Sequence, residues 1–131
     1  MRVLLLCLVT GCAATLNGGK PRPSVLRDVE GYAIASCLAH QNDDYLMEQG
    51  SGWASVIIQR GDGGIGAFAA VSEKVQAELS RSEMAVVRVE SPSGASDRPL
   101  PILYCSEIID RPSVRMAIKK AVADLASGYE E

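Results

Sequence analysis

The chain has 131 residues, about the length of one ordinary domain, and 47% of them are hydrophobic while 22% are charged. This composition predicts a single globular domain. A formal net charge of −3 leaves no basic surface to neutralise phosphates, so nonspecific binding to nucleic acid or to an acidic membrane is unfavourable. Aromatic residues are only 5% of the chain and alanine is abundant, which favours helices over a β-sandwich.

The first residues have the pattern of an export signal. Arg2 is followed by a short apolar run over residues 3–9, too short to span a bilayer. The segment from Val9 to Cys12 resembles a bacterial lipobox, so we expect a lipoprotein-type signal peptide over residues 1–11 and lipidation of Cys12. Two alternatives remain, an ordinary cleavage site shortly after Cys12 or an apolar segment that belongs to the fold.

Either route of export leads to the periplasm, and the lipidated form would be anchored to the outer membrane. Residues 12–23 then form a flexible tether, because they contain turn-forming residues and no periodicity. Residues 24–131 form the folded domain.

Export gives the four cysteines different fates. Cys7 leaves with the signal and Cys12 lies at the new terminus, so the folded part keeps Cys37 and Cys105. In an oxidising compartment we expect these two to form one intramolecular disulfide. In the loop-entropy model a bridge this long would stabilise the domain by about 4 kcal/mol. Two separate buried thiols are the alternative.

Helical periodicity predicts two helices in the first half of the domain. The first runs from Ser24, as N-cap, to about His40, with Cys37 on its buried side. The second begins near Tyr45 after a cap at Asn42 or Asp43. Gly50-Ser51-Gly52 either interrupts this helix or packs tightly, and the pattern leaves residues 53–58 open between helix and strand.

The second half of the domain contains two more predicted helices and a polar loop. The third helix contains Phe68, Val71, Val75 and Leu79. Residues 84–90 could form a short strand or continue that helix. Ser91 to Pro99 is the most polar stretch and is predicted as a surface loop. The last helix follows a cap at Asp110, with Pro112 in its first turn and an apolar stripe from Val114 to Leu125.

No motif in the chain indicates catalysis. Residues 61–66 match Gly-x-Gly-x-x-Gly, but a clear second strand–helix unit does not follow, so a dinucleotide site is unfavoured. His40 could act as base to a Cys37 thiolate, as in a cysteine hydrolase, but a disulfide would remove that nucleophile. His40, Asp43 and Asp44 offer at most three metal ligands. We therefore expect no enzyme activity, no cofactor and no metal.

Three segments together resemble the type VI secretion amidase immunity proteins of the fourth amidase family. They are Tyr32-Ala33-Ile34-Ala35-Ser36-Cys37-Leu38-Ala39, Gly50-Ser51-Gly52-Trp53-Ala54-Ser55 and Leu100-Pro101-Ile102-Leu103-Tyr104-Cys105-Ser106-Glu107-Ile108-Ile109. In the family the last segment has a cysteine that precedes a short apolar helix. The likeness covers about residues 24–125. The glycine-rich residues 61–66 and residues 86–89 depart from the family pattern.

The resemblance implies a small all-α periplasmic domain, usually a homodimer, that inhibits a peptidoglycan-cleaving amidase. The family blocks the amidase cleft with a protruding loop before the second cysteine, which corresponds here to residues 91–99. Partner-binding residues are therefore expected to be Ser91, Ser93, Gly94, Ala95, Ser96, Asp97 and Arg98. From the residues alone, an idle solvated hairpin or loop is an equally good interpretation of this stretch. The alternative function is an envelope lipoprotein, binding or structural, without a toxin partner.

Overall fold

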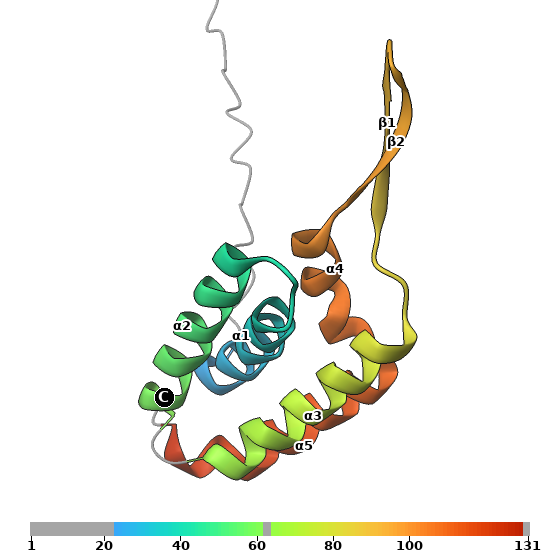
Figure 1. Cartoon of the computed structure of the whole chain (residues 1–131). Coiled ribbons are helices and arrows are strands. Elements are labelled where there is room, and N and C mark those ends of the chain that lie inside the picture. Colours follow the sequence, from blue (N-terminus) through green and yellow to red (C-terminus); the bar gives the residue numbers. More distant parts are fainter. Residues whose placement is uncertain (1–22, 62–63, 130–131) are drawn as a thin grey trace, which may run out of the picture.

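The computed structural model describes residues 23–61 and 64–129, which form a mainly helical body with one projecting β-hairpin (Figure 1). The predominance of helix agrees with the sequence prediction. The purely all-α class is wrong, because two antiparallel strands, β1 (Val86–Ser91) and β2 (Gly94–Pro99), make the fold mixed. The predicted signal peptide, the lipidation site Cys12 and most of the tether lie outside the described residues.

Helix α1 (Ser24–Ala39) lies at the centre of the body and contacts each of the other four α-helices. Val29, Ala33 and Cys37 are completely buried, as expected from their helical spacing. The predicted cap at Ser24 is wrong, because Pro23 is the N-cap residue and no side chain caps the helix. The helix ends at His40, as predicted.

Helix α2 (Asp44–Arg60) is continuous, which settles the open question about residues 50–58. Its N-terminus is capped as predicted, because the Asp43 carboxylate accepts a hydrogen bond from the Leu46 backbone N–H at 2.9 Å. Gly50 does not interrupt the helix. It is buried where α2 crosses α1, and its missing side chain allows the two backbones to approach closely.

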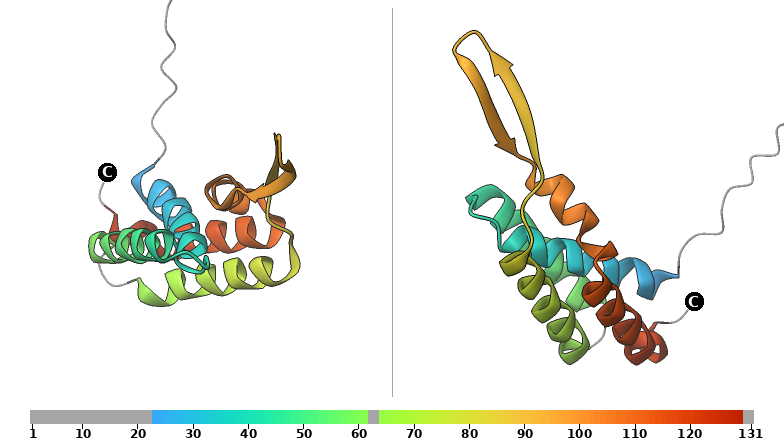
Figure 2. Two further views of the ribbon diagram at one scale, coloured as in Figure 1. Left: turned by 45° about the horizontal axis from the view of Figure 1, so that its top comes forward. Right: turned by 90° about the vertical axis from the view of Figure 1, so that its right-hand side faces the viewer.

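Helices α3 (Ile65–Arg81) and α5 (Pro112–Leu125) lie side by side under α1 (Figures 1 and 2). Phe68, Val71, Val75, Val114 and Ile118 are completely buried, which confirms the predicted apolar stripes of both helices.

The start of α5 differs in one respect from the prediction. Pro112 is in the first turn as expected, but the N-cap is Arg111, and Asp110 does not cap the helix. The Asp110 carboxylate instead accepts a hydrogen bond from Arg115 at 3.0 Å.

Short elements complete the chain. Helix α4 (Pro101–Glu107) follows the hairpin and continues into the 3₁₀ helix η1 (Ile108–Asp110), and a second 3₁₀ helix, η2 (Ala126–Gly128), follows α5. Cys105 lies within α4 and does not precede it, contrary to the pattern of the family segment.

The predicted disulfide is confirmed by the positions of its two cysteines. Cys37 in α1 and Cys105 in α4 are bonded, their Cα atoms are 5.5 Å apart, and the bridge spans 68 positions of sequence. Both cysteines are fully buried. The bridge therefore ties the segment that follows the hairpin to the central helix.

Candidate functional site

The β-hairpin is the most exposed regular structure of the described chain. It projects from one end of the helical body, away from all the helices (Figures 1 and 2). Every residue from Glu90 to Pro99 is exposed, and no residue of either strand is fully buried. A segment held out in this way contributes little to the core, so its residues are available for contact with another molecule.

The turn of the hairpin depends on a short sequence signal. Pro92 and Ser93 connect the strands, and the Ser91 hydroxyl donates to the Gly94 carbonyl at 2.9 Å. Gly94 has φ of +122°, a conformation that favours glycine over residues with a side chain. A proline early in the turn and a glycine at its end are typical of β-turns. This pattern could have indicated a hairpin where the sequence analysis predicted a loop.

The structure therefore corrects the predicted loop of residues 91–99. It consists of the last residue of β1, a two-residue turn and the whole of β2. The structure brings the seven predicted partner-binding residues together on this one hairpin. Sequence reasoning missed the residues of β1 before Ser91, of which Val86 and Val87 are 55% and 42% exposed. Arg88 of β1 lies 3.8 Å from Asp97 of β2, an exposed cross-strand ion pair.

Both ends of the hairpin are attached to the body by specific contacts. At the β1 end, the hydroxyl groups of Ser82 and Tyr104 are hydrogen bonded to each other. At the β2 end, Leu100 N–H donates to the Ala85 carbonyl at 2.8 Å, and the disulfide follows five residues later. These attachments fix where the hairpin leaves the body.

The C-terminus of α3, from which the chain enters the hairpin, is held by a buried carboxylate. Glu78 accepts hydrogen bonds from Arg81 and from Ser113 of α5. The hydrogen bond from Arg81, and then the one from Ser113, lower the pKa of Glu78 below its usual value. The charged form of Glu78 therefore stabilises this attachment.

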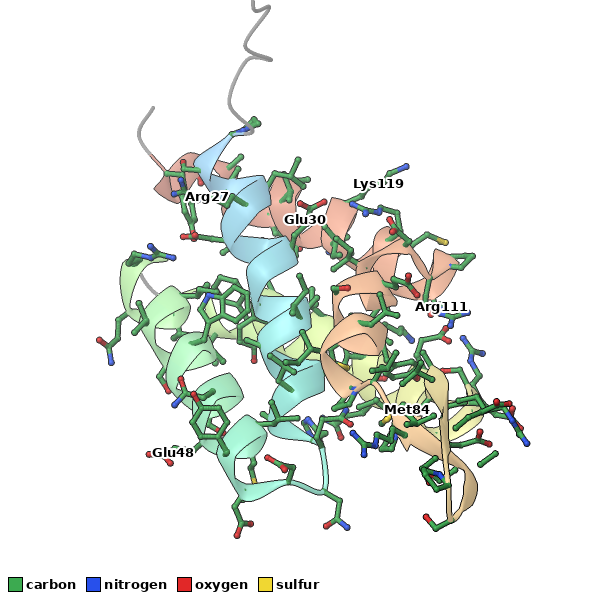
Figure 3. All side chains as sticks on the ribbon, turned by 90° about the horizontal axis from the view of Figure 1, so that it is seen from above. Arg27, Glu30, Glu48, Met84, Arg111 and Lys119 are labelled. Atoms are coloured by element: carbon green, nitrogen blue, oxygen red, sulfur yellow. A yellow bond between two sulfur atoms is a disulfide. The ribbon has the colours of Figure 1, made fainter. Side chains whose placement is uncertain are left out.

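A hollow of about 410 Å³ lies at the base of the hairpin. It is formed by Gln41, Asn42 and Asp43 after α1, by Met84, and by Pro99 at the end of β2. Figure 3 shows Met84 where the hairpin meets the helices. The hollow separates the root of the hairpin from the α1–α2 turn.

In the described part of the chain, the other candidate sites do not form. Cys37 is in the disulfide, so it offers no thiolate, and the exposed His40 donates through Nδ1 to the Ser36 carbonyl at 2.7 Å. Within residues 23–61 and 64–129, no three His, Cys, Asp or Glu side chains are placed to hold a metal. Gly61 follows helix α2 and Ile65 and Gly66 already belong to helix α3, whereas a dinucleotide site requires a strand before the glycines. Asp62 and Gly63 of this segment lie outside the described residues.

A second concave surface lies between α3 and α5. It has a volume of about 540 Å³, and its lining includes Ala67, Ala70 and Ala117 with the exposed Met116 and Lys74. The sequence analysis did not predict this groove, because it needs two helices distant in sequence to lie side by side.

Comparison with protein-family models, with curated proteins and with solved structures found no match to this chain. None of the helices in the described part of the chain is long and apolar enough to cross a membrane. The functional interpretation therefore depends on the chain's own residues and on the geometry of the hairpin.

Proposed function

We propose that the protein is a periplasmic immunity protein that inhibits a peptidoglycan-cleaving amidase delivered by type VI secretion. The observation that carries this proposal is the exposed hairpin, which is attached at both ends to a disulfide-linked helical body. A preorganised projection loses less conformational entropy on entering a cleft than a flexible loop does. The resemblance of three sequence segments to the fourth amidase immunity family supports the same function.

The chemistry of the hairpin suits a narrow polar cleft. Ser93, Ser96 and Asp97 offer small hydrogen-bonding groups, and Gly94 and Ala95 add little bulk beside them. We propose that these residues, with Ser91 and Arg98, contact the catalytic cleft of the amidase. In this function the protein acts as a binding partner and performs no catalysis itself. A homodimer would add a second helical surface to the contact.

The proposal predicts that an amidase is encoded beside this gene, and an experiment with that enzyme tests it. Residues 93–97 are replaced by a Gly-Ser stretch of equal length, and binding is measured by calorimetry. The dissociation constant should rise at least about tenfold, equivalent to about 1.4 kcal/mol, with the helical content and the disulfide unchanged. In cells, the variant should no longer protect against the amidase exported to the periplasm.

A matched pair of substitutions separates the hairpin from the rest of the surface. Asp97→Ala and Glu48→Ala each remove one exposed carboxylate, and Glu48 is on α2, far from the hairpin (Figure 3). Only Asp97→Ala should weaken binding. If the hairpin variants bind and protect as well as the wild type does, the contact surface lies elsewhere.

A binding domain without a toxin partner is the second candidate function, and the groove between α3 and α5 is the observation that favours it. Its mostly apolar lining suits a ligand or a peptide. If the neighbouring gene encodes no amidase and the protein does not bind one, this candidate replaces the first.

A further inference from the structure

The two edges of the hairpin can be distinguished from one backbone hydrogen bond. Leu100 N–H donates to the Ala85 carbonyl, so these two residues form a hydrogen-bonded pair that extends the register of the strands. In an antiparallel ladder such pairs alternate with pairs whose N–H and C=O groups point outward. The outward pairs are therefore Val86 with Pro99, Arg88 with Asp97, and Glu90 with Ala95.

Proline interrupts the row of outward N–H groups on β2, whereas the row on β1 is complete. Pro99 has no N–H, so the outward row on β2 lacks a donor there. On β1, each of the outward residues Val86, Arg88 and Glu90 has both a donor and an acceptor. An edge without proline is a template for another strand, and a two-stranded hairpin is only marginally stable without a third strand.

We propose that β1 pairs antiparallel with β1 of a second copy of this chain, which forms a four-stranded sheet in the order β2–β1–β1–β2. Charge complementarity selects both the partner and the register. With Val89 facing Val89 of the second copy, Arg88 lies opposite Glu90 on both sides of the two-fold axis. Moving the axis by one residue places Arg88 against itself or Glu90 against itself, which is unfavourable.

The pairing also gives partners to the outward backbone hydrogen-bonding groups of β1 and to its apolar side chains. Arg88 and Glu90 both point their backbone groups outward, so they meet as hydrogen-bonded pairs in the new ladder. Val87 and Val89 share one face of β1, and Val89 is already partly buried. The pairing does not depend on the amidase proposal, and it leaves the side of β2 that faces away from β1 uncovered.

A charge-exchange experiment tests the register. Sedimentation velocity of the purified protein over a concentration series should show a monomer–dimer equilibrium. Arg88→Glu and Glu90→Arg should each raise the dimer dissociation constant at least about tenfold, because each places like charges opposite each other. The double variant should return to within about threefold of the wild type. Arg88→Glu and the double variant both place a carboxylate at position 88, next to Asp97 of the same hairpin. A recovery of dimer affinity in the double variant therefore cannot come from the contact with Asp97.

A second pair of variants tests the edge itself. Arg88→Pro removes one outward N–H from β1, and Asp97→Pro removes one from β2. Neither of these N–H groups is hydrogen bonded between β1 and β2. Only Arg88→Pro should prevent dimerisation. The proposal is overturned by a protein that is monomeric throughout the series, by a dimer that Arg88→Pro leaves intact, or by a double variant that dissociates as readily as the single ones.

Discussion

At the level of single residues, three buried carboxylates connect the helices through hydrogen bonds. Asp28 and Glu30 of α1 accept hydrogen bonds from Arg60 of α2 at 2.9 Å and from Arg115 of α5 at 2.6 Å. Glu78 of α3 accepts from Ser113 of α5. None of the three acidic residues is more than 6% exposed. Removing the arginine partner would take away the closest positive charge from a buried carboxylate, which is costly.

Glu78 should make the stability of the protein depend on pH. Because its pKa is lowered in the folded state, its contribution is complete above the unfolded pKa and is lost as the pH falls through the folded pKa. We expect the melting temperature of the wild type to fall more between about pH 6 and about pH 3 than that of Glu78→Gln.

Glu73→Gln is the matched control for this prediction. Glu73 lies on the same helix, its side chain is 78% exposed, and its ion pair with Lys74 is at 4.0 Å. Its removal should leave the pH dependence of the melting temperature unchanged. Equal pH dependence of the wild type and Glu78→Gln would contradict the assignment.

At the level of elements, the sequence patterns predicted the helices better than they predicted the strands. Phe68, Val71 and Val75 recur at spacings that only a helix places on one face, and all three are buried. The hairpin has no such signal, because neither of its faces is buried in the body and its residues do not alternate clearly. The open choice for residues 84–90 was therefore decided only by the structure, and β2 was missed. The α3–α5 groove and the ion pairs of Asp28 and Glu30 depend on contacts between distant segments, which local patterns do not encode.

Two glycines of α2 should respond in opposite directions to the same substitution. A Cβ on Gly50 would meet the backbone nitrogen of Ala39 and lie 2.6 Å from the carbonyl oxygen of Ala35, whereas a Cβ on Gly52 would meet nothing within 4 Å. Gly52→Ala should stabilise the protein by about 0.5–1 kcal/mol through helix propensity. Gly50→Ala should destabilise it by about 1–3 kcal/mol, because α2 must move away from α1.

Chemical denaturation followed by circular dichroism measures both changes. The two variants have the same change in composition and lie in one helix, so the difference between them reports the contact with α1. Similar unfolding free energies for Gly50→Ala and Gly52→Ala would show that α1 and α2 do not pack this closely.

At the level of the whole molecule, the Cys37–Cys105 bridge connects the first and the second half of the chain. We expect the double variant Cys37→Ala, Cys105→Ala to keep its helical content and to lose about 4 kcal/mol of unfolding free energy in the loop-entropy model. Most of this loss arises in the unfolded chain, which the bridge no longer restricts.

Peptide mapping without reduction provides the direct measurement for the bridge. It should recover the Cys37 and Cys105 peptides as one linked species, and alkylation of the protein unfolded without reductant should label neither residue. Labelling of both thiols before reduction would mean that the two cysteines are buried separately.

The position of the hairpin turn relative to the bridge has a consequence for limited proteolysis. A cut between Pro92 and Ser93 divides the chain into two fragments, and each fragment carries one of the bonded cysteines. No core residue lies between Val86 and Pro99, so the nicked halves would still share a complete core. They would migrate as one species until a reductant separates them. The tip of the hairpin is thus a natural place to open the chain, whether for a split version of the protein or for new termini in a circular permutant.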